Sequence, residues 1–128
     1  MIRTDELMLG NWVEYATGLN NDKRSIPMYV TAIFDDEVYL DFPGNEGDPF
    51  EVRDEDLLGI PITDELLEKC GFDMCHDHIW KVGDTILFQN PDDFDLNLDG
   101  QHIHGIIFLH ELQNAYFMLT RKHLEVKL

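Results

Sequence analysis

The sequence predicts an α+β protein: an N-terminal SH3-like small β-barrel or curled sheet, then a helix, an antiparallel β-meander and a C-terminal helix. Three observations lead to this fold class. The first 60 residues contain short β-branched and aromatic segments separated by turn-forming residues. Signals for the start and end of a helix surround residues 63–70. The last third of the chain alternates polar and apolar residues and then changes to helical spacing.

Two segments carry the strand-like pattern of the first half: residues 9–15 (LGNWVEY) and residues 28–42 (MYVTAIFDDEVYLDF). The second segment contains an Asp-Asp pair in its middle, which predicts a hairpin. Residues 43–49 (PGNEGDP) have the composition of a loop. Short strands at this spacing are typical of small barrels, so we expect residues 1–60 to form an SH3-like half.

The second half, residues 61–128, opens with a helix. Thr63 can cap this helix, acidic residues suit its first turn, and Gly71 can end it. We therefore expect a helix over residues 63–70, with Cys70 on its buried side. The two halves are expected to pack as one compact unit.

The remainder predicts an antiparallel meander over residues 79–107 and a helix over residues 109–120. Polar and apolar residues alternate over residues 93–98, and Asp99-Gly100 is a favoured two-residue hairpin turn. The helix is predicted because leucine and aromatic residues recur at helical spacing. Residues 123–128 alternate again and predict an edge strand.

The charge of the chain is strongly negative and unevenly distributed. The 128 residues include 26 acidic and nine basic residues, which gives a net charge of −17, and residues 35–99 hold 20 of the acidic and three of the basic residues. A field of this sign repels the nucleic-acid backbone, so direct DNA or RNA binding is not expected. The segment is expected to be either a solvated acidic face or a docking surface for a basic protein partner.

The sequence contains no apolar stretch of the length that a membrane span requires, and its N-terminus lacks a secretory signal. We therefore expect a cytoplasmic protein that does not enter a membrane. Two cysteines, Cys70 and Cys75, are too few and too close for a disulfide framework.

One short motif has part of a calcium-binding pattern. Asp95, Asn97 and Asp99 alternate before a glycine, as oxygen ligands do in the first half of a calcium loop. The position that should supply a bidentate carboxylate is Ile106, which cannot bind a metal. A hairpin with a polar outer face explains the same residues.

A transition-metal site is a second possibility for this hairpin. In the expected register, Asn97 faces His102 and Asp95 faces His104, so Asp95, His102 and His104 could act as metal ligands. A cross-strand pair of a histidine and a carboxylate is the alternative interpretation. The cysteine and histidine residues near Cys75 do not have the spacing of a zinc finger. No cofactor is expected.

Complete catalytic motifs are absent from the sequence. Ser25 is the only serine and has no nucleophile-elbow pattern around it. The sequence also lacks a glycine-rich phosphate loop and an HExxH pair. Enzymatic function is therefore not the leading hypothesis.

The segments GNWVEY, GIPITDELLEKCGF and FLHELQNAYFMLTRKHLEV, in this order, resemble a group of small uncharacterised proteins of Bacteroides-type bacteria, their phages and mobile elements. The residues that carry the resemblance are Pro61, Thr63, Gly71, Phe72, His110, Leu112, Gln113 and Asn114. The resemblance implies an intracellular setting and a mobile-element origin, and it implies no activity.

The resemblance draws attention to His110, Gln113 and Asn114 as a candidate binding cluster. Residues three and four apart share a helix face, so these three polar side chains can lie together. The alternative is that they only connect the helix to neighbouring backbone groups by hydrogen bonds.

We therefore expect a non-enzymatic acidic protein-interaction or accessory module of phage or mobile-element origin. The first alternative is a DNA mimic that inhibits a host nucleic-acid-binding protein. The second is a metal-dependent hydrolase that uses Asp95, His102 and His104.

Overall fold

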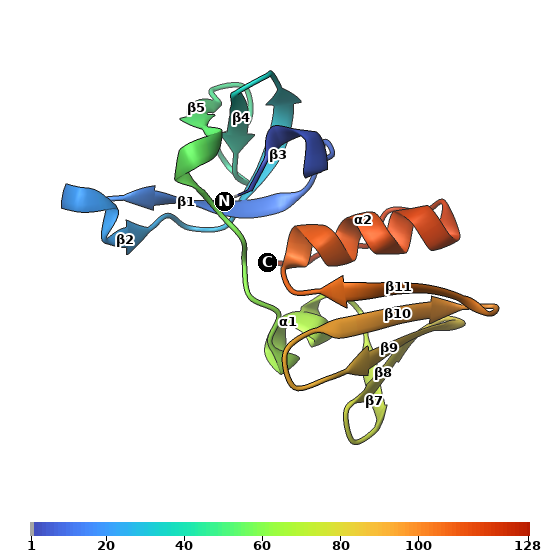
Figure 1. Cartoon of the computed structure of the whole chain (residues 1–128). Coiled ribbons are helices and arrows are strands. Elements are labelled where there is room, and N and C mark those ends of the chain that lie inside the picture. Colours follow the sequence, from blue (N-terminus) through green and yellow to red (C-terminus); the bar gives the residue numbers. More distant parts are fainter. Residues whose placement is uncertain (1) are drawn as a thin grey trace. The chain divides into compact units, whose positions relative to one another are not determined.

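The computed structural model describes residues 2–128, and the chain divides into two compact units, Met1–Ile60 and Pro61–Leu128. Figure 1 shows that each unit has its own sheet, and the strands pair antiparallel in both. The predicted α+β class is confirmed. Within residues 2–128, every helix is too short or too polar to cross a membrane.

The first unit contains a six-stranded curled sheet. Its strands are β1 (Trp12–Thr17), β2 (Lys23–Arg24), β3 (Met28–Ile33), β4 (Glu37–Asp41), β5 (Phe50–Arg53) and β6 (Leu57–Leu58). Its 3₁₀ turns are η1 (Thr4–Glu6), η2 (Leu19–Asn21) and η3 (Asp54–Asp56). The strand order is β2-β1-β3-β4-β5, and β6 pairs with β1. Because η3 leads the chain from β5 directly to β6, the last strand returns to the first strand and the sheet curls.

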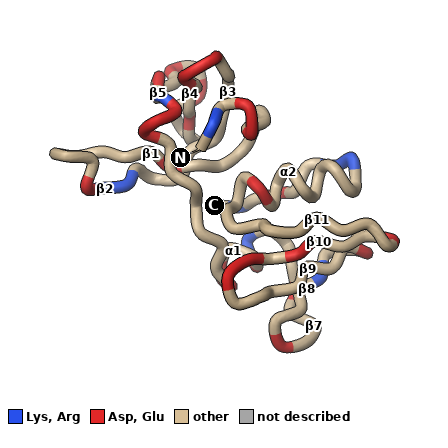
Figure 2. Tube along the Cα trace, in the orientation of Figure 1, with Lys and Arg blue, Asp and Glu red and all other residues tan. Residues whose placement is uncertain are grey.

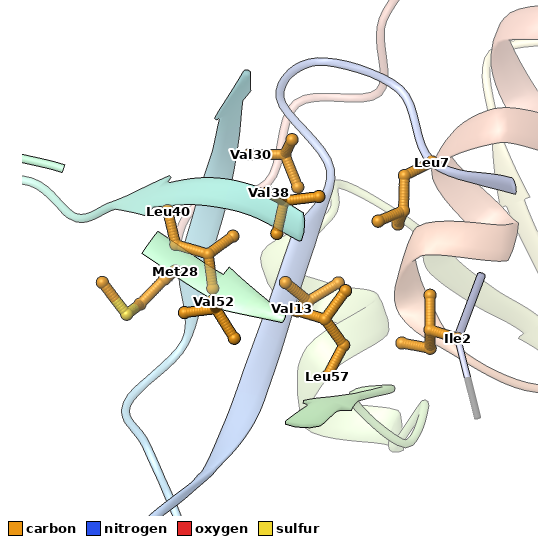
Figure 3. Packing of buried hydrophobic residues seen from close by; sticks show 9 residues of the cluster. All are labelled: Ile2, Leu7, Val13, Met28, Val30, Val38, Leu40, Val52 and Leu57. Carbon is orange, nitrogen blue, oxygen red and sulfur yellow. The ribbon is translucent and has the colours of Figure 1, made fainter. Parts of the chain in front are cut away.

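An apolar cluster fills the inner side of this curled sheet (Figure 3). Its members are buried aliphatic and methionine side chains from every strand except β2, together with residues around η1: Ile2, Leu7, Val13, Met28, Val30, Val38, Leu40, Val52 and Leu57. In β4, buried Val38 and Leu40 alternate with the outward residues Glu37 and Tyr39, because successive side chains of a strand point to opposite faces. This alternation determines which side chains of β4 face the solvent.

The second unit is a five-stranded meander with two helices. In chain order its elements are α1 (Asp64–Lys69), β7 (Asp73–His76), β8 (Ile79–Val82), β9 (Thr85–Gln89), β10 (Phe94–Leu98), β11 (Gln101–Ile106) and α2 (Leu109–Thr120). The helix α2 packs on β10 and β11, as Figure 1 shows. The largest fully buried side chains of this unit are Leu67, Phe72, Trp80, Leu87, Leu96, Ile106, Leu109, His110 and Leu112.

Local signals account for both helices. The Leu66 amide donates a hydrogen bond to the Thr63 hydroxyl at 3.1 Å, so Thr63 caps α1, and Gly71 follows the helix with φ of 86°. The Glu111 carboxylate accepts a hydrogen bond from the Phe108 amide at 2.9 Å at the start of α2. At the other end of α2, Arg121 adopts the left-handed conformation.

The structure differs from the sequence expectations at several elements. The strands β2, β5, β6 and β7 were not predicted. The segment over 123–128 is not a strand, which corrects the predicted edge strand. Instead, Leu124 is buried and the Lys127 amide donates a hydrogen bond to the Lys69 carbonyl at 3.0 Å, so the segment is attached to the end of α1.

Candidate functional site

Two acidic segments that are distant in the sequence lie side by side at one end of the first sheet. The tight turn between β3 and β4 carries Asp35 and Asp36, and η3 follows β5. The Asp54 amide donates a hydrogen bond to the Asp36 carbonyl at 2.9 Å, which joins the turn to η3. The register of β4 and β5 causes this arrangement, because Glu37 pairs with Arg53. The carboxylates of residues 35–37 and 54–56 are thereby concentrated at one edge.

Arg53 is the basic residue at the centre of this edge. Its guanidinium lies 3.4 Å from the Asp36 carboxylate and 3.5 Å from the Glu55 carboxylate. All three side chains are more than half exposed, so each ion pair contributes little to stability. Arg53 therefore compensates part of the charge without closing the edge to another molecule.

An aromatic patch adjoins the carboxylates on the outer face of β4 and β5. The rings of Phe34 and Tyr39 lie 5.0 Å apart, and the Tyr39 hydroxyl donates a hydrogen bond to the Glu51 carboxylate at 3.3 Å. Phe34 is 45% exposed, and Tyr39 is half-buried. The patch therefore offers apolar and aromatic surface to the solvent, with carboxylates on its border.

The electrostatics of Tyr39 reflect these neighbours. The negative charge of Glu51, partial burial of the phenol, the hydrogen bond to Glu51 and the charge of Glu37 raise the pKa of Tyr39. The phenol therefore keeps its proton at physiological pH and remains a hydrogen-bond donor. An uncharged phenol also presents a ring face that attracts cations.

We use the name acidic–aromatic surface for ten residues: Phe34, Asp35, Asp36, Glu37, Tyr39, Glu51, Arg53, Asp54, Glu55 and Asp56. Its seven carboxylates and one guanidinium give a net charge of −6. Figure 2 shows that acidic residues occur in both units and that they gather around β3, β4 and β5 in the first unit. This surface can attract and hold a cationic group by charge, hydrogen bonds and ring contacts.

Asp41 has a different role from the carboxylates of this surface. It is only 3% exposed, and its oxygens accept hydrogen bonds from the Phe42 amide at 2.9 Å, the Asn45 side chain at 3.1 Å and the Gly47 amide at 3.2 Å. The carboxylate therefore organises the loop that connects β4 to β5. This loop brings β5 into register with β4 and so supports the acidic–aromatic surface.

The predicted metal ligands of the second unit are only partly brought together. The Nδ1 atom of His104 lies 3.2 Å from a carboxylate oxygen of Asp95, and the rings of His102 and His104 stack at 5.9 Å. Asn97 pairs with His102 as predicted, whereas an irregularity between Phe94 and Leu96 shifts Asp95 from its expected place opposite His104. Over residues 2–128, no group of three or more His, Cys, Asp and Glu residues is arranged to hold a metal ion.

Within this hairpin, the carboxylate of Asp95 has a clearly shifted pKa. Burial alone would raise its pKa, but hydrogen bonds from Asn90 and His104, the charge of His104 and the Gly105 amide together lower the pKa. The pair corresponds to the cross-strand interpretation given above.

The second predicted cluster lies on α2. His110 is 1% exposed, and its ring stacks on Phe108 at 6.1 Å between centroids. Gln113 and Asn114 are half-buried one turn later, and all three residues have interaction partners. The binding role of His110, Gln113 and Asn114 stays a prediction.

The aromatic part of the candidate site is not predicted from the sequence. Phe34 and Tyr39 were assigned to a hairpin only as strand residues, and no role was given to them. The signal that could have identified them is the direct neighbourhood of aromatic and acidic residues in IFDDEVYLD. Comparisons of the chain with protein-family models, with curated proteins and with solved structures find no match.

Proposed function

We propose that this protein is a non-enzymatic interaction module whose acidic–aromatic surface binds a basic segment of another protein. The observation that carries the proposal is the junction of two acidic segments, residues 35–37 and 54–56, beside the exposed ring of Phe34 and the half-buried ring of Tyr39. The carboxylates and the aromatic rings can both bind lysine and arginine side chains.

The expected recognition follows from the chemistry of these groups. Carboxylates form charge-assisted hydrogen bonds with guanidinium and ammonium groups, and aromatic ring faces attract the same cations. A net charge of −6 on a small surface also accelerates the encounter with a basic partner. Repulsion among seven carboxylates costs stability, and binding a basic segment would relieve it.

The chain connections of the first unit support the same proposal. We infer that residues 1–60 form an SH3-like small barrel, because η3 connects β5 to a short strand that pairs with β1. Such barrels serve binding in many proteins, although fold alone does not fix function. The resemblance to proteins of Bacteroides-type bacteria, their phages and mobile elements suggests a cytoplasmic, mobile-element setting for this binding.

The test uses a fluorescently labelled peptide of alternating arginine and glycine residues as the probe. Fluorescence anisotropy measures its affinity for the whole chain at low salt. Neutralising η3 with D54N, E55Q and D56N is expected to weaken binding by roughly tenfold, because three of the seven carboxylates lose their charge. Y39L, made alone in the otherwise unchanged chain, is also expected to weaken binding, because it removes the aromatic ring beside Glu51.

A matched control separates a specific surface from general attraction to an acidic protein. The variant D73N, D77N and D84N removes the same three charges from exposed positions of the second unit. It should bind the peptide with nearly the affinity of the unchanged chain. Equal weakening by the two triple variants would refute the proposal, because affinity would then follow net charge alone.

A further inference from the structure

A second candidate binding site lies in the second unit, where the chain forms a pocket of about 550 Å³. The pocket opens between the end of α1 and the segment that follows α2. Its size falls within the range of pockets that hold small molecules. It is separate from the acidic–aromatic surface, and its residues all belong to Pro61–Leu128.

The segment after α2 forms one wall of this pocket and is held in place at several points. Arg121 turns the chain at the end of the helix, and the His123 ring stacks on Phe117 at 4.7 Å. Leu124 is buried, and the backbone bond from Lys127 to Lys69 attaches the segment to α1. These contacts hold the wall of the pocket in place, so the pocket is part of the folded structure of the unit.

The charge of the pocket is opposite to that of the unit around it. Residues 61–128 carry twelve acidic and five basic side chains, and three of those five, Lys69, Lys122 and Lys127, line the pocket. Glu68 and Glu125 are the carboxylates that also line it. With three ammonium groups and two carboxylates, the lining is net positive.

The remaining walls are apolar or aromatic. Val82, Leu124 and Tyr116 line the pocket beside Cys70. Burial raises the pKa of the Cys70 thiol to about 12, so the sulfur stays protonated and uncharged. Lys69 is paired with Glu65 at 3.5 Å, but this pair is exposed and leaves the ammonium available to a ligand.

We propose that this pocket binds a small organic anion that carries one oxyanion group, a carboxylate or a phosphate, on an apolar body. The lysine ammonium groups would hold the oxyanion, and the wall of Val82, Tyr116 and Leu124 would pack against the apolar part. Net positive lining in a strongly negative chain selects for anions, which the rest of the protein repels.

Titration followed by amide NMR spectra tests this proposal with three probes of similar size. Phenyl phosphate and benzoate carry the oxyanion, and benzyl alcohol is their uncharged counterpart. At least one of the two anions is expected to shift the amide signals of residues 69–71 and 122–127 to saturation. Benzyl alcohol should bind at least about tenfold more weakly, because it cannot form charge-assisted hydrogen bonds.

Variants locate the site and control for general charge effects. K122E and K127E should each weaken the bound anion by roughly tenfold, since each replaces an attracting charge with a repelling one. K81E makes the same change at an exposed lysine of β8 outside the pocket and should leave the affinity unchanged. Two results would overturn the proposal: neither anion binds to the unchanged chain, or K81E weakens binding as much as the pocket variants do.

Discussion

The side chain of Asp41 is the clearest case of a single residue on which the candidate binding surface depends. The carboxylate is buried, and three donors from the loop after β4 surround it. A buried donor that loses its acceptor bears the full cost of desolvation. The loop conformation, and through it the position of β5, therefore depends on this one carboxylate.

Replacing Asp41 with alanine is expected to lower the free energy of unfolding by about 2 to 3 kcal/mol, because the donors lose their acceptor. Urea unfolding followed by circular dichroism measures this loss. D48A is the control, because Asp48 lies in the same loop with an exposed side chain. If D41A and D48A unfold at the same urea concentration, the loop does not depend on Asp41.

Asp95 provides a prediction about pH. The pKa of Asp95 is lower in the folded protein than in the unfolded chain, where it is near 4. The interactions of the ionised carboxylate therefore stabilise the fold at pH values above the unfolded pKa. This stabilisation disappears as the pH falls through the lower pKa of the folded protein. D95N should therefore cost about 1 kcal/mol at neutral pH, and the difference from the unchanged chain should shrink below pH ~4. Unfolding curves at several pH values measure the difference. A constant difference down to pH ~2 would exclude a charge-dependent role.

At the scale of elements, Gly105 makes the irregular pairing of β10 and β11 possible. Its φ is 74°, a left-handed conformation that glycine adopts without strain, and the space around it is open. It lies beside the point where the register shifts opposite Asp95. The same shift lets the Gly105 amide act on the Asp95 carboxylate.

G105A is expected to reduce the free energy of unfolding by about 1 kcal/mol, since alanine disfavours this backbone conformation. G105N should cost less, because asparagine tolerates a left-handed backbone better than alanine does. Chemical unfolding of the two variants checks the order. An alanine variant as stable as the unchanged chain would show that the hairpin can change its pairing without cost.

Elements with a strong local pattern are the ones that the sequence predicts well. The helix expected over residues 109–120 is found at Leu109–Thr120, because its leucines follow the helical period. The Asp99-Gly100 turn occurs where it was expected, with positive φ at both residues. In contrast, β7 was missed because all four of its residues are exposed and show no alternation.

Pairing between distant segments explains the other errors. Residues 123–128 alternate like a strand, but they pair with no sheet edge. The buried side chain of Leu124 and one backbone hydrogen bond hold the segment in place instead of strand pairing. The acidic–aromatic surface has the same origin. The sequence shows that residues 35–99 are acidic, whereas the junction of Asp36 with Asp54 depends on the register of β4 and β5 across a loop. Such register is not readable from composition.

At the scale of the whole molecule, the net charge of −17 lowers the free energy of unfolding, and added salt should reduce this effect. Repulsion among carboxylates destabilises a compact chain, and dissolved ions screen it. We expect the free energy of unfolding at pH 7 to rise by about 1 kcal/mol between ~20 mM and ~500 mM sodium chloride. Thermal unfolding at both salt concentrations measures the change, and sodium sulfate at equal ionic strength separates screening from other salt effects.

The variant D54N, E55Q and D56N links this cost to the proposed function. It should be at least as stable as the unchanged chain at low salt, because three repelling charges are removed. It should also show a smaller gain in stability when salt is added. A clear loss of stability would mean that the carboxylates of η3 support the fold, and their presence would then need no binding partner to explain it.

The two binding proposals concern different units, so they can be tested separately on the same chain. The acidic–aromatic surface should respond to cationic peptides, and the pocket should respond to small anions. Variants at one site should leave binding at the other site unchanged, because none of the ten surface residues lines the pocket.

The measurement that tests the central claim most directly is an NMR titration of the whole chain with the arginine-glycine peptide. We predict that the amide signals of residues 34–39 and 51–56 shift together and saturate, while the signals of the exposed acidic residues Asp73, Asp77 and Asp84 change little. Shifts of similar size at all exposed carboxylates, or the absence of shifts at Phe34 and Tyr39, would contradict the assignment of this surface as the binding site.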